Sequence, residues 1–242
     1  MNKEILITGG AQRIGKKLVH HFHDVGWLVI FQYRSSSDSA NILCRELNEK
    51  RPNSCQAIQC DFDDEKSFDE FCKNINKNAG NLCALINNAS TFYPKKITEI
   101  KTEDWNKLMS SNLKTPIFLI SSLAEKLKEN KGHIINIADI YAEQGMSGYS
   151  IYAAAKAGLY NLTKSLAREL APKVLVNSIS PGSILWDVNE PSEEKKKKIL
   201  SSIPMKRLGS EKDIVMLADY LIRKNTYMTG RNISVDGGKS LG

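Results

Sequence analysis

A tyrosine and a lysine four residues apart form the pair in this sequence best suited to acid–base chemistry. Tyr152 and Lys156 enclose three alanines within a stretch of helical periodicity. Residues i and i+4 of an α-helix share one face, with about 5–6 Å between their Cβ atoms. A lysine charge at that distance favours the phenolate and lowers a tyrosine pKa that is ordinarily near 10. We therefore predict that Tyr152 donates a proton and that Lys156 lowers its pKa.

An aspartate thirteen residues before Tyr152 is a second candidate proton donor. Asp139 follows the apolar segment 132–137, which is predicted to be a strand. A partly buried carboxyl has a raised pKa and can deliver a proton near neutral pH. The alternative is a structural acid that caps a nearby turn.

A glycine-containing turn at residues 8–15, Thr-Gly-Gly-Ala-Gln-Arg-Ile-Gly, joins the first predicted strand to the first predicted helix. Gly9 permits a tight turn, and Gly15 allows the helix to pack closely. The N-terminus of the helix then offers free N–H groups to a pyrophosphate. An ordinary tight turn is the alternative interpretation.

The end of the second predicted strand indicates which dinucleotide would bind. NAD sites usually place an acidic residue there, whereas this strand ends in Tyr33-Arg34-Ser35. Arg34 can pair with a 2′-phosphate, assisted by Arg13. We therefore predict NADPH as the cofactor. Asp61, after the third strand, is placed to bind the adenine amino group.

Short apolar segments alternate with amphipathic ones along the whole chain. Wholly apolar strands separated by helices predict a parallel sheet covered on both faces. We predict an α/β, single-domain, Rossmann-type doubly wound fold over residues 1–242, with ligands beyond the carboxyl ends of the strands. The predicted strands are 4–7, 27–33, 56–60, 82–86, 132–137, 174–179 and 232–235, and the predicted helices are 14–25, 41–50, 65–77, 103–128, 149–170, 193–201 and 211–223.

These motifs together resemble the short-chain dehydrogenase/reductase family over essentially the whole chain. The resemblance implies hydride transfer from a nicotinamide cofactor, and a homotetramer. It also implies that Asn112 lies in a helix irregularity and supports a proton relay through Lys156, which makes Asn112, Asp139, Tyr152 and Lys156 the predicted catalytic set. The predicted cofactor-binding residues are Gly9, Arg13, Ile14, Gly15, Tyr33, Arg34, Ser35, Asp61, Phe62, Asn88, Ala89, Ser90, Tyr152, Lys156, Pro181, Gly182 and Ser183.

Two departures from the usual family pattern narrow the resemblance. Arg13 stands where the middle glycine of the turn is usual, and Asp139 stands where a carbonyl-binding serine is usual. Both changes resemble the pteridine reductases and the related bacterial dihydromonapterin and dihydrofolate reductases, as does the segment 88–94, Asn-Ala-Ser-Thr-Phe-Tyr-Pro. The implied reaction is NADPH-dependent reduction of a pterin, and the implied substrate-binding residues are Phe92, Asp139, Tyr152 and Trp186, with a substrate lid at about residues 186–209.

Two other functions stay open at this point. A short-chain reductase acting on a carbonyl, such as a 3-oxoacyl thioester, is the first, and Asp139 in place of serine disfavours it. A non-catalytic regulator that binds a dinucleotide is the second. A complete set of Asn112, Tyr152 and Lys156 argues against such a regulator, because a sensor needs no proton relay.

Composition limits the remaining possibilities. The chain has 242 residues and a formal charge of +7, but it lacks a nucleic-acid-reading motif, and the run of lysines at 195–198 is interpreted as a solvated helix. Five cysteines without a CxxC pair predict free thiols in the cytoplasm. No apolar run is long enough to span a membrane. We expect no metal, since His20, His21 and His23 have no matching acidic cluster.

Overall fold

Seven parallel strands form the middle layer of the protein, as shown by a computed structural model that describes residues 3–185 and 191–241. Their order in the sheet is β3-β2-β1-β4-β5-β6-β7, and every neighbouring pair is parallel. The predicted doubly wound Rossmann-type sheet is thereby confirmed. The strands are β1 (Glu4–Ile7), β2 (Leu28–Tyr33), β3 (Cys55–Gln59), β4 (Leu82–Asn87), β5 (His133–Ile137), β6 (Leu175–Pro181) and β7 (Asn232–Val235).

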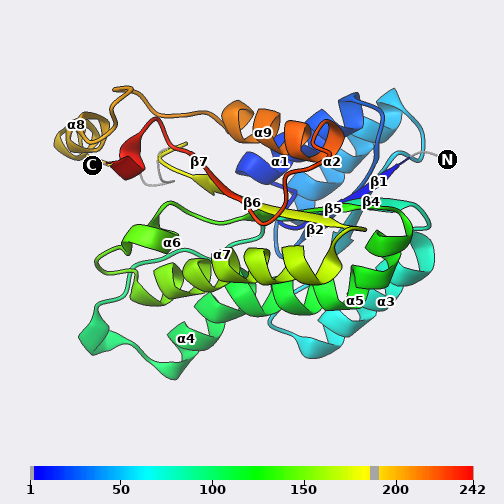
Figure 1. The fold of residues 1–242 in the computed structure, drawn as a ribbon, viewed down its shortest axis with the longest axis horizontal. Helices are drawn as coiled ribbons and strands as arrows, with labels where there is room; N and C mark the ends of the chain where they lie inside the picture. The colour runs from blue at the N-terminus through cyan, green and yellow to red at the C-terminus, as the bar shows by residue number, and fades with distance from the viewer. Residues whose placement is uncertain (1–2, 186–190, 242) are drawn as a thin grey trace.

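Helices cover both faces of this sheet (Figure 1). Helices α1, α2 and α9 lie on one face, and α3, α5 and α7 lie on the other. The helices are α1 (Arg13–Asp24), α2 (Ser37–Lys50), α3 (Glu65–Asn78), α4 (Thr102–Met109), α5 (Thr115–Glu129), α6 (Tyr141–Gln144), α7 (Ser150–Leu170), α8 (Glu193–Ser201) and α9 (Glu211–Arg223), with short 3-10 helices at Ile97–Glu99 and Lys239–Leu241.

Alternate residues of one strand enter two separate cores, which explains why the strands read as unbroken apolar runs. Ile5 and Ile7 of β1 pack with Leu18 of α1 on one face of the sheet. Leu6, between them, packs with Leu119 of α5 on the other face. A strand buried on both faces gains from apolar side chains at every position, so its sequence loses the polar alternation of a half-exposed strand.

The direction of winding reverses between β1 and β4. From β1 the chain proceeds outward through β2 and β3, and it then returns to β4 on the other side of β1 before adding β5, β6 and β7. The loops that leave the carboxyl ends of β1 and β4 diverge at this point. In an open α/β sheet, such a switch point is where ligands bind.

One predicted long helix is interrupted in the structure. The segment predicted as a single helix over 103–128 comprises α4, a π-helical segment at Ser110–Lys114 and then α5. Asn112 lies in that segment, and its side-chain Nδ2 donates to the carbonyl oxygen of Leu108 at 2.9 Å. The predicted start of the second helix at residue 41 was also wrong, because α2 begins at Ser37. The short helix α6 was not predicted.

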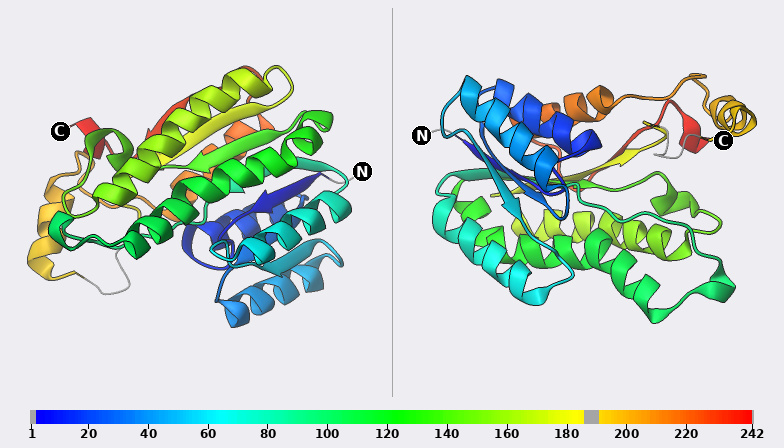
Figure 2. Two further views of the ribbon diagram at one scale, coloured as in Figure 1. Left: turned by 90° about the horizontal axis from the view of Figure 1, so that it is seen from below. Right: turned by 180° about the vertical axis from the view of Figure 1, so that it is seen from behind.

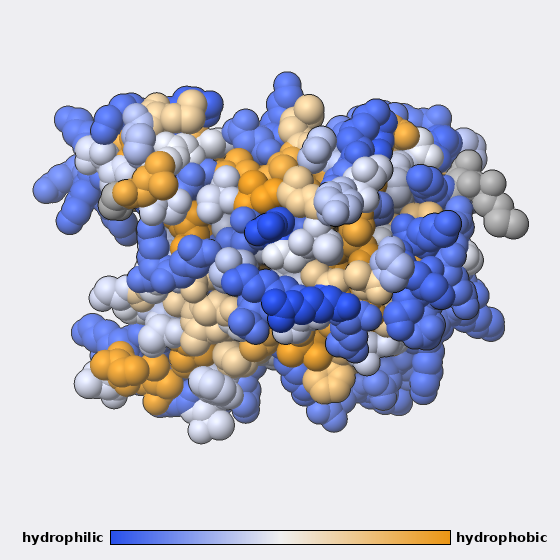
Figure 3. Space-filling model, in the orientation of Figure 1, coloured by the Kyte–Doolittle hydropathy of each residue, from blue (hydrophilic) through white to orange (hydrophobic). Residues whose placement is uncertain are grey.

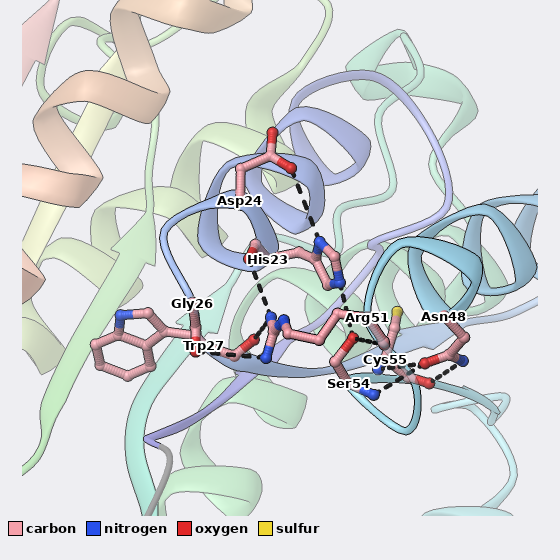
Figure 4. A network of polar contacts seen from close by, with 8 residues as sticks. All are labelled: His23, Asp24, Gly26, Trp27, Asn48, Arg51, Ser54 and Cys55. Carbon is pink, nitrogen blue, oxygen red and sulfur yellow. Dashed lines mark hydrogen bonds and ion pairs between the residues drawn. The ribbon is translucent and has the colours of Figure 1, made fainter.

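A polar network ties the loop between α2 and β3 to the turn between α1 and β2 (Figure 4). Arg51 Nη2 donates to the carbonyl oxygens of His23 at 3.0 Å and Trp27 at 2.6 Å. Asn48 Oδ1 accepts from the backbone N–H groups of Ser54 and Cys55 at 2.9 and 3.0 Å. His23, for which no metal role was predicted, is buried here as a structural residue.

Among residues 3–185 and 191–241, no helix has both the length and the apolar character needed to cross a bilayer. Trp105 of α4 and Phe118 of α5 are exposed, so neither belongs to the core.

Candidate active site

A cavity of about 590 Å³ opens at the carboxyl ends of β1, β4, β5 and β6. Figure 3 shows the surface notched at the left, below α8. The structure therefore brings together residues that lie far apart in the sequence. The predicted site residues that line this cavity are Gly9, Arg13, Ile14, Gly15, Asn88, Ala89, Ser90, Phe92, Asp139, Tyr152, Lys156, Pro181, Gly182 and Ser183.

Asp139 and Tyr152 are in direct contact inside the cavity. The Tyr152 hydroxyl donates to Oδ2 of Asp139 at 2.7 Å. The other carboxylate oxygen, Oδ1, accepts the backbone N–H of Tyr141 at 2.9 Å at the start of α6. Oδ1 therefore caps a turn, as the structural interpretation expects, while Oδ2 contacts the tyrosine. Proton donation by Asp139 stays a prediction.

The pKa of Tyr152 differs from the sequence prediction. Burial of the phenol and the nearby Asp139 carboxylate raise this pKa well above 10. The prediction that Lys156 lowers it was wrong for this structure, since the carboxylate contacts the hydroxyl directly. The predicted rise in the pKa of Asp139 is found, and its first cause is burial. Tyr152 is accordingly a protonated donor at neutral pH, hydrogen-bonded to a carboxyl group that holds its own proton more tightly than usual.

The ammonium of Lys156 is hydrogen-bonded to the backbone, not to the tyrosine hydroxyl. Its Nζ donates to the carbonyl oxygen of Ile137 at 2.8 Å and lies 5.7 Å from the centroid of the Tyr152 ring. The side chain is 2% exposed, and burial lowers its pKa to about 8. The predicted helical pairing brings the two residues together on one face of α7, but in this structure the ammonium is bonded to the backbone.

Asn112 lies behind the cavity and reaches it through a serine. The π-helical segment turns its side chain inward, where it is 1% exposed. Its Nδ2 donates to the carbonyl oxygen of Thr91 at 2.8 Å. Its Oδ1 accepts the hydroxyl of Ser90 at 2.8 Å. Asn112 is therefore a positioning residue, and Ser90, predicted to bind the cofactor, is its link to the cavity.

The glycine turn is tightly folded, and its binding of a phosphate stays a prediction. Gly9 has φ +65°, and a Cβ added at Gly15 would lie 2.0 Å from the carbonyl oxygen of Gly9. The turn and the first residues of α1 line the cavity, and the first N–H groups of a helix have no partner within the helix. Arg13 has φ +49°, which is the left-handed conformation that favours glycine, and this explains why glycine is usual at that position.

Side chains hold the turn in place from neighbouring strands. Asn88 Nδ2 donates to the carbonyl oxygens of Thr8 at 2.9 Å and Gly9 at 3.1 Å. Gln32, a buried residue of β2, accepts the N–H of Gly9 through Oε1 at 2.9 Å and donates to Cys60 at 2.7 Å. Gln32 was not predicted from the sequence. The available signal was a single amide in an otherwise apolar strand.

Five predicted cofactor residues do not line the cavity. Tyr33, Arg34 and Ser35 lie at the end of β2, where the carbonyl oxygen of Arg34 accepts from Gln59 Nε2 at 3.1 Å. Asp61 Oδ1 accepts the N–H of Asp63, and Phe62 packs edge-on against two phenylalanines of α3. These positions flank the first half of the sheet, so their assignment to the adenosine end stays a prediction.

An aromatic wall closes the other side of the cavity. Phe92 stacks on Tyr149 with a centroid distance of 4.5 Å and an interplanar angle of 14°. It also meets Tyr152 edge-on, with centroids 4.8 Å apart. Phe92 was predicted here from the sequence, whereas Tyr149 was not. Trp186 lies outside the described residues, as do its neighbours up to residue 190.

Comparison with known proteins identifies the family. The family model described as enoyl-(acyl carrier protein) reductase matches residues 9–240. The chain belongs to the short-chain dehydrogenase/reductase family. It is therefore an oxidoreductase of a family that uses nicotinamide dinucleotides.

Relatives of this short-chain reductase fall into two groups. The chain is 36% identical to a dihydromonapterin reductase of Enterobacter sp. (strain 638), across 99% of this chain and 97% of that protein. It is 34% identical to a dihydromonapterin reductase of Escherichia coli O6:K15:H31, across 98% and 96%. It is also 33% identical to a 3-oxoacyl-(acyl-carrier-protein) reductase of Staphylococcus epidermidis, across 98% and 99%. Sequence identity thus leaves the substrate of this short-chain reductase between two classes.

The described part of this short-chain reductase contains no group of three or more His, Cys, Asp or Glu side chains that could hold a metal ion. His21 Nε2 instead contacts Asp219 Oδ1 at 2.8 Å and ties α1 to α9. Within the cavity, Asp139, Tyr152 and Lys156 supply groups for acid–base chemistry.

Proposed function

We propose that this protein reduces dihydropterins or dihydrofolate to the tetrahydro form, with NADPH as the hydride donor. The observation that supports the proposal is the contact between Asp139 and the Tyr152 hydroxyl at 2.7 Å beside an aromatic wall. Reduction of a C=N bond places a proton on nitrogen. A carboxyl group with a raised pKa can supply that proton, whereas a serine at the same position would stabilise a carbonyl oxygen.

The residues of the cavity have complementary tasks in this reaction. A bound nicotinamide cofactor would supply the hydride. Phe92 would hold a flat heterocycle by stacking. Asp139 and Tyr152 form a hydrogen-bonded pair of acids that can pass a proton to the ring nitrogen. Lys156 and Asn112 would fix the surrounding hydrogen bonds. The ammonium of Lys156 could then return a proton to the acid pair and take one from solvent.

The dihydromonapterin reductases among the relatives support the proposal, and the 3-oxoacyl reductases support a second candidate function at nearly equal identity. The second candidate is reduction of a 3-oxoacyl thioester at the same cavity. Oxidation of NADPH should be followed by absorbance with dihydrobiopterin, dihydrofolate and acetoacetyl-CoA as substrates. We expect turnover of the two pterins. Turnover of acetoacetyl-CoA alone would overturn the pterin assignment.

Cofactor preference gives a separate prediction. Arg34→Ala should lower kcat/KM with NADPH about tenfold or more and change kcat/KM with NADH much less, because the guanidinium pairs only with the 2′-phosphate. Steady-state kinetics with both cofactors measure the ratio. Arg45→Ala, an exposed arginine of α2 paired with Glu49, is the matched control. An unchanged ratio in Arg34→Ala would mean that another residue holds the phosphate.

We also propose a cytoplasmic homotetramer. Free cysteines support the location, since all five in the chain are unpaired thiols. The exposed apolar side chains of Trp105, Ile117 and Phe118 on α4 and α5 support association between copies of the chain. Light scattering at several protein concentrations tests the state of assembly.

A further inference from the structure

Positive charge in the cavity exceeds what the proposed chemistry uses. Its lining contains Arg13, Lys156, Lys195 and Lys239, with Asp139 as the only carboxylate among the described lining residues. Arg13 belongs to the glycine turn, and Lys156 is bonded to the backbone behind Tyr152. Lys195 and Lys239 remain without an assigned role.

Lys239 is held inside the cavity by the segment that follows β7. Its Nζ donates to the hydroxyl of Ser183 at 2.8 Å and lies 5.6 Å from the centroid of the Tyr141 ring. Among the described residues, Asp236 forms no ion pair with Lys239, and its carboxylate instead accepts the backbone N–H groups of Gly238 and Ser240. An ammonium has three donors, so Lys239 keeps capacity to bind a further acceptor.

Lys195 lines the cavity from helix α8. It lies in the first turn of α8, where the carboxylate of Glu193 pairs with Lys196 at 2.8 Å. No carboxylate in the described part of the chain pairs with Lys195 or with Lys239. Helix α8 and the C-terminal 3-10 helix lie at the same end of the molecule (Figure 2). Both lysines line the same cavity, one from α8 and one from the segment after β7.

The cavity combines an aromatic wall with two lysines that have no assigned role. Phe92, Tyr149 and Tyr152 form an apolar wall that suits a flat ring, and the two lysines line the same cavity from α8 and from the segment after β7. A ligand that meets both has a flat heterocycle at one end and a negative charge at the other.

We propose that Lys195 and Lys239 form an anion-binding subsite, which selects pterins whose side chain ends in a carboxylate or a phosphate ester. The inference rests on the proposed function, because it assumes that a pterin ring occupies the aromatic wall. Under it, the preferred substrate is a dihydropterin with an anionic side chain, and an uncharged dihydropterin is a poorer one.

A ratio of specificities tests the subsite. In each variant, kcat/KM is measured for dihydrofolate, which has carboxylates, for dihydroneopterin monophosphate, which has a phosphate ester, and for the uncharged dihydrobiopterin. The anionic-to-neutral ratio cancels any general effect of Lys239 on Asp139. We expect Lys239→Gln to lower this ratio about tenfold, as loss of a charged hydrogen bond does, and the more exposed Lys195→Gln to lower it about threefold. If the ratio falls more for dihydrofolate, the subsite prefers a carboxylate. If it falls more for dihydroneopterin monophosphate, the subsite prefers a phosphate ester.

Matched variants distinguish the subsite from a general effect of charge and from a role in cofactor binding. Lys197→Gln lies on the same helix outside the cavity and should leave the ratio unchanged. Lys239→Arg retains the charge and should keep most of the ratio. A lower affinity for NADPH in Lys239→Gln, with an unchanged ratio, would assign this lysine to the cofactor and overturn the subsite. If Lys195→Gln and Lys239→Gln both turn over all three pterins with an unaltered anionic-to-neutral ratio, the subsite is overturned and the proposed function stands. Absence of any pterin turnover by the unmodified protein overturns the proposed function, and the subsite with it.

Discussion

Replacing Tyr152 by phenylalanine is expected to lower kcat about a thousandfold while leaving the dissociation constant for NADPH within about twofold of the unmodified protein. General acid catalysis contributes factors of this size. The substitution removes one oxygen atom, and the ring can keep its edge-on contact with Phe92, whose centroid lies 4.8 Å away. The hydroxyl that donates to Asp139 is lost, and the donor to the substrate is lost with it.

Two measurements decide this prediction. Single-turnover kinetics report the chemical step, and quenching of protein fluorescence by NADPH reports binding. Tyr160→Phe provides the matched control, because Tyr160 lies on the same helix α7 but outside the cavity. Full activity of Tyr152→Phe would exclude the tyrosine as a proton donor. A large loss of NADPH affinity in the variant would assign Tyr152 to cofactor binding.

Most of the fold could be predicted because burial in a doubly covered sheet leaves a simple pattern. Strands β1 and β7 and helices α8 and α9 were predicted to the residue, and the other strands to within one or two residues. Side chains of apolar runs such as Ile5 to Ile7 pack into cores on both faces of the sheet. An unbroken apolar run of this length is typical of a strand in a doubly covered parallel sheet. Helix starts were less predictable, since the serines at the start of α2 resemble a turn.

The rise in the pKa of Asp139 was predicted, but that of Tyr152 was not, because it depends on which loops meet. The spacing of Tyr152 and Lys156 describes one helix and predicts a lowered tyrosine pKa. The observed rise comes from burial and from Asp139, which reaches the hydroxyl from the end of β5. Tyr149, Gln32 and Lys239 were missed for the same reason. Each acquires its role through a contact across the fold that local sequence does not encode.

The structure gives Asp139 two tasks, and substitution can separate them. Oδ1 accepts the N–H of Tyr141 and shapes the turn, while Oδ2 accepts the Tyr152 hydroxyl. Asp139→Asn keeps an oxygen for the turn but cannot carry an exchangeable acidic proton. We expect it to lower kcat with dihydrobiopterin about a hundredfold, with little change in the thermal midpoint of unfolding. Asp139→Ser should show the same loss, because a serine hydroxyl does not ionise in this range.

The pH dependence of activity gives a second test of the proton-donating role of Asp139. Burial raises the pKa of Asp139 above its ordinary value, and the protonated carboxyl is the form that donates. Activity of the unmodified protein should therefore be highest below that pKa and should fall as the pH rises through it. The Asp139→Asn profile should lack this descending limb, as measured by kcat/KM for dihydrobiopterin across the pH range in which the protein stays folded. If the asparagine variant kept both its rate and its limb, Asp139 would serve only to cap the turn at Tyr141. The strongest reason for preferring a pterin over a 3-oxoacyl thioester would then be lost.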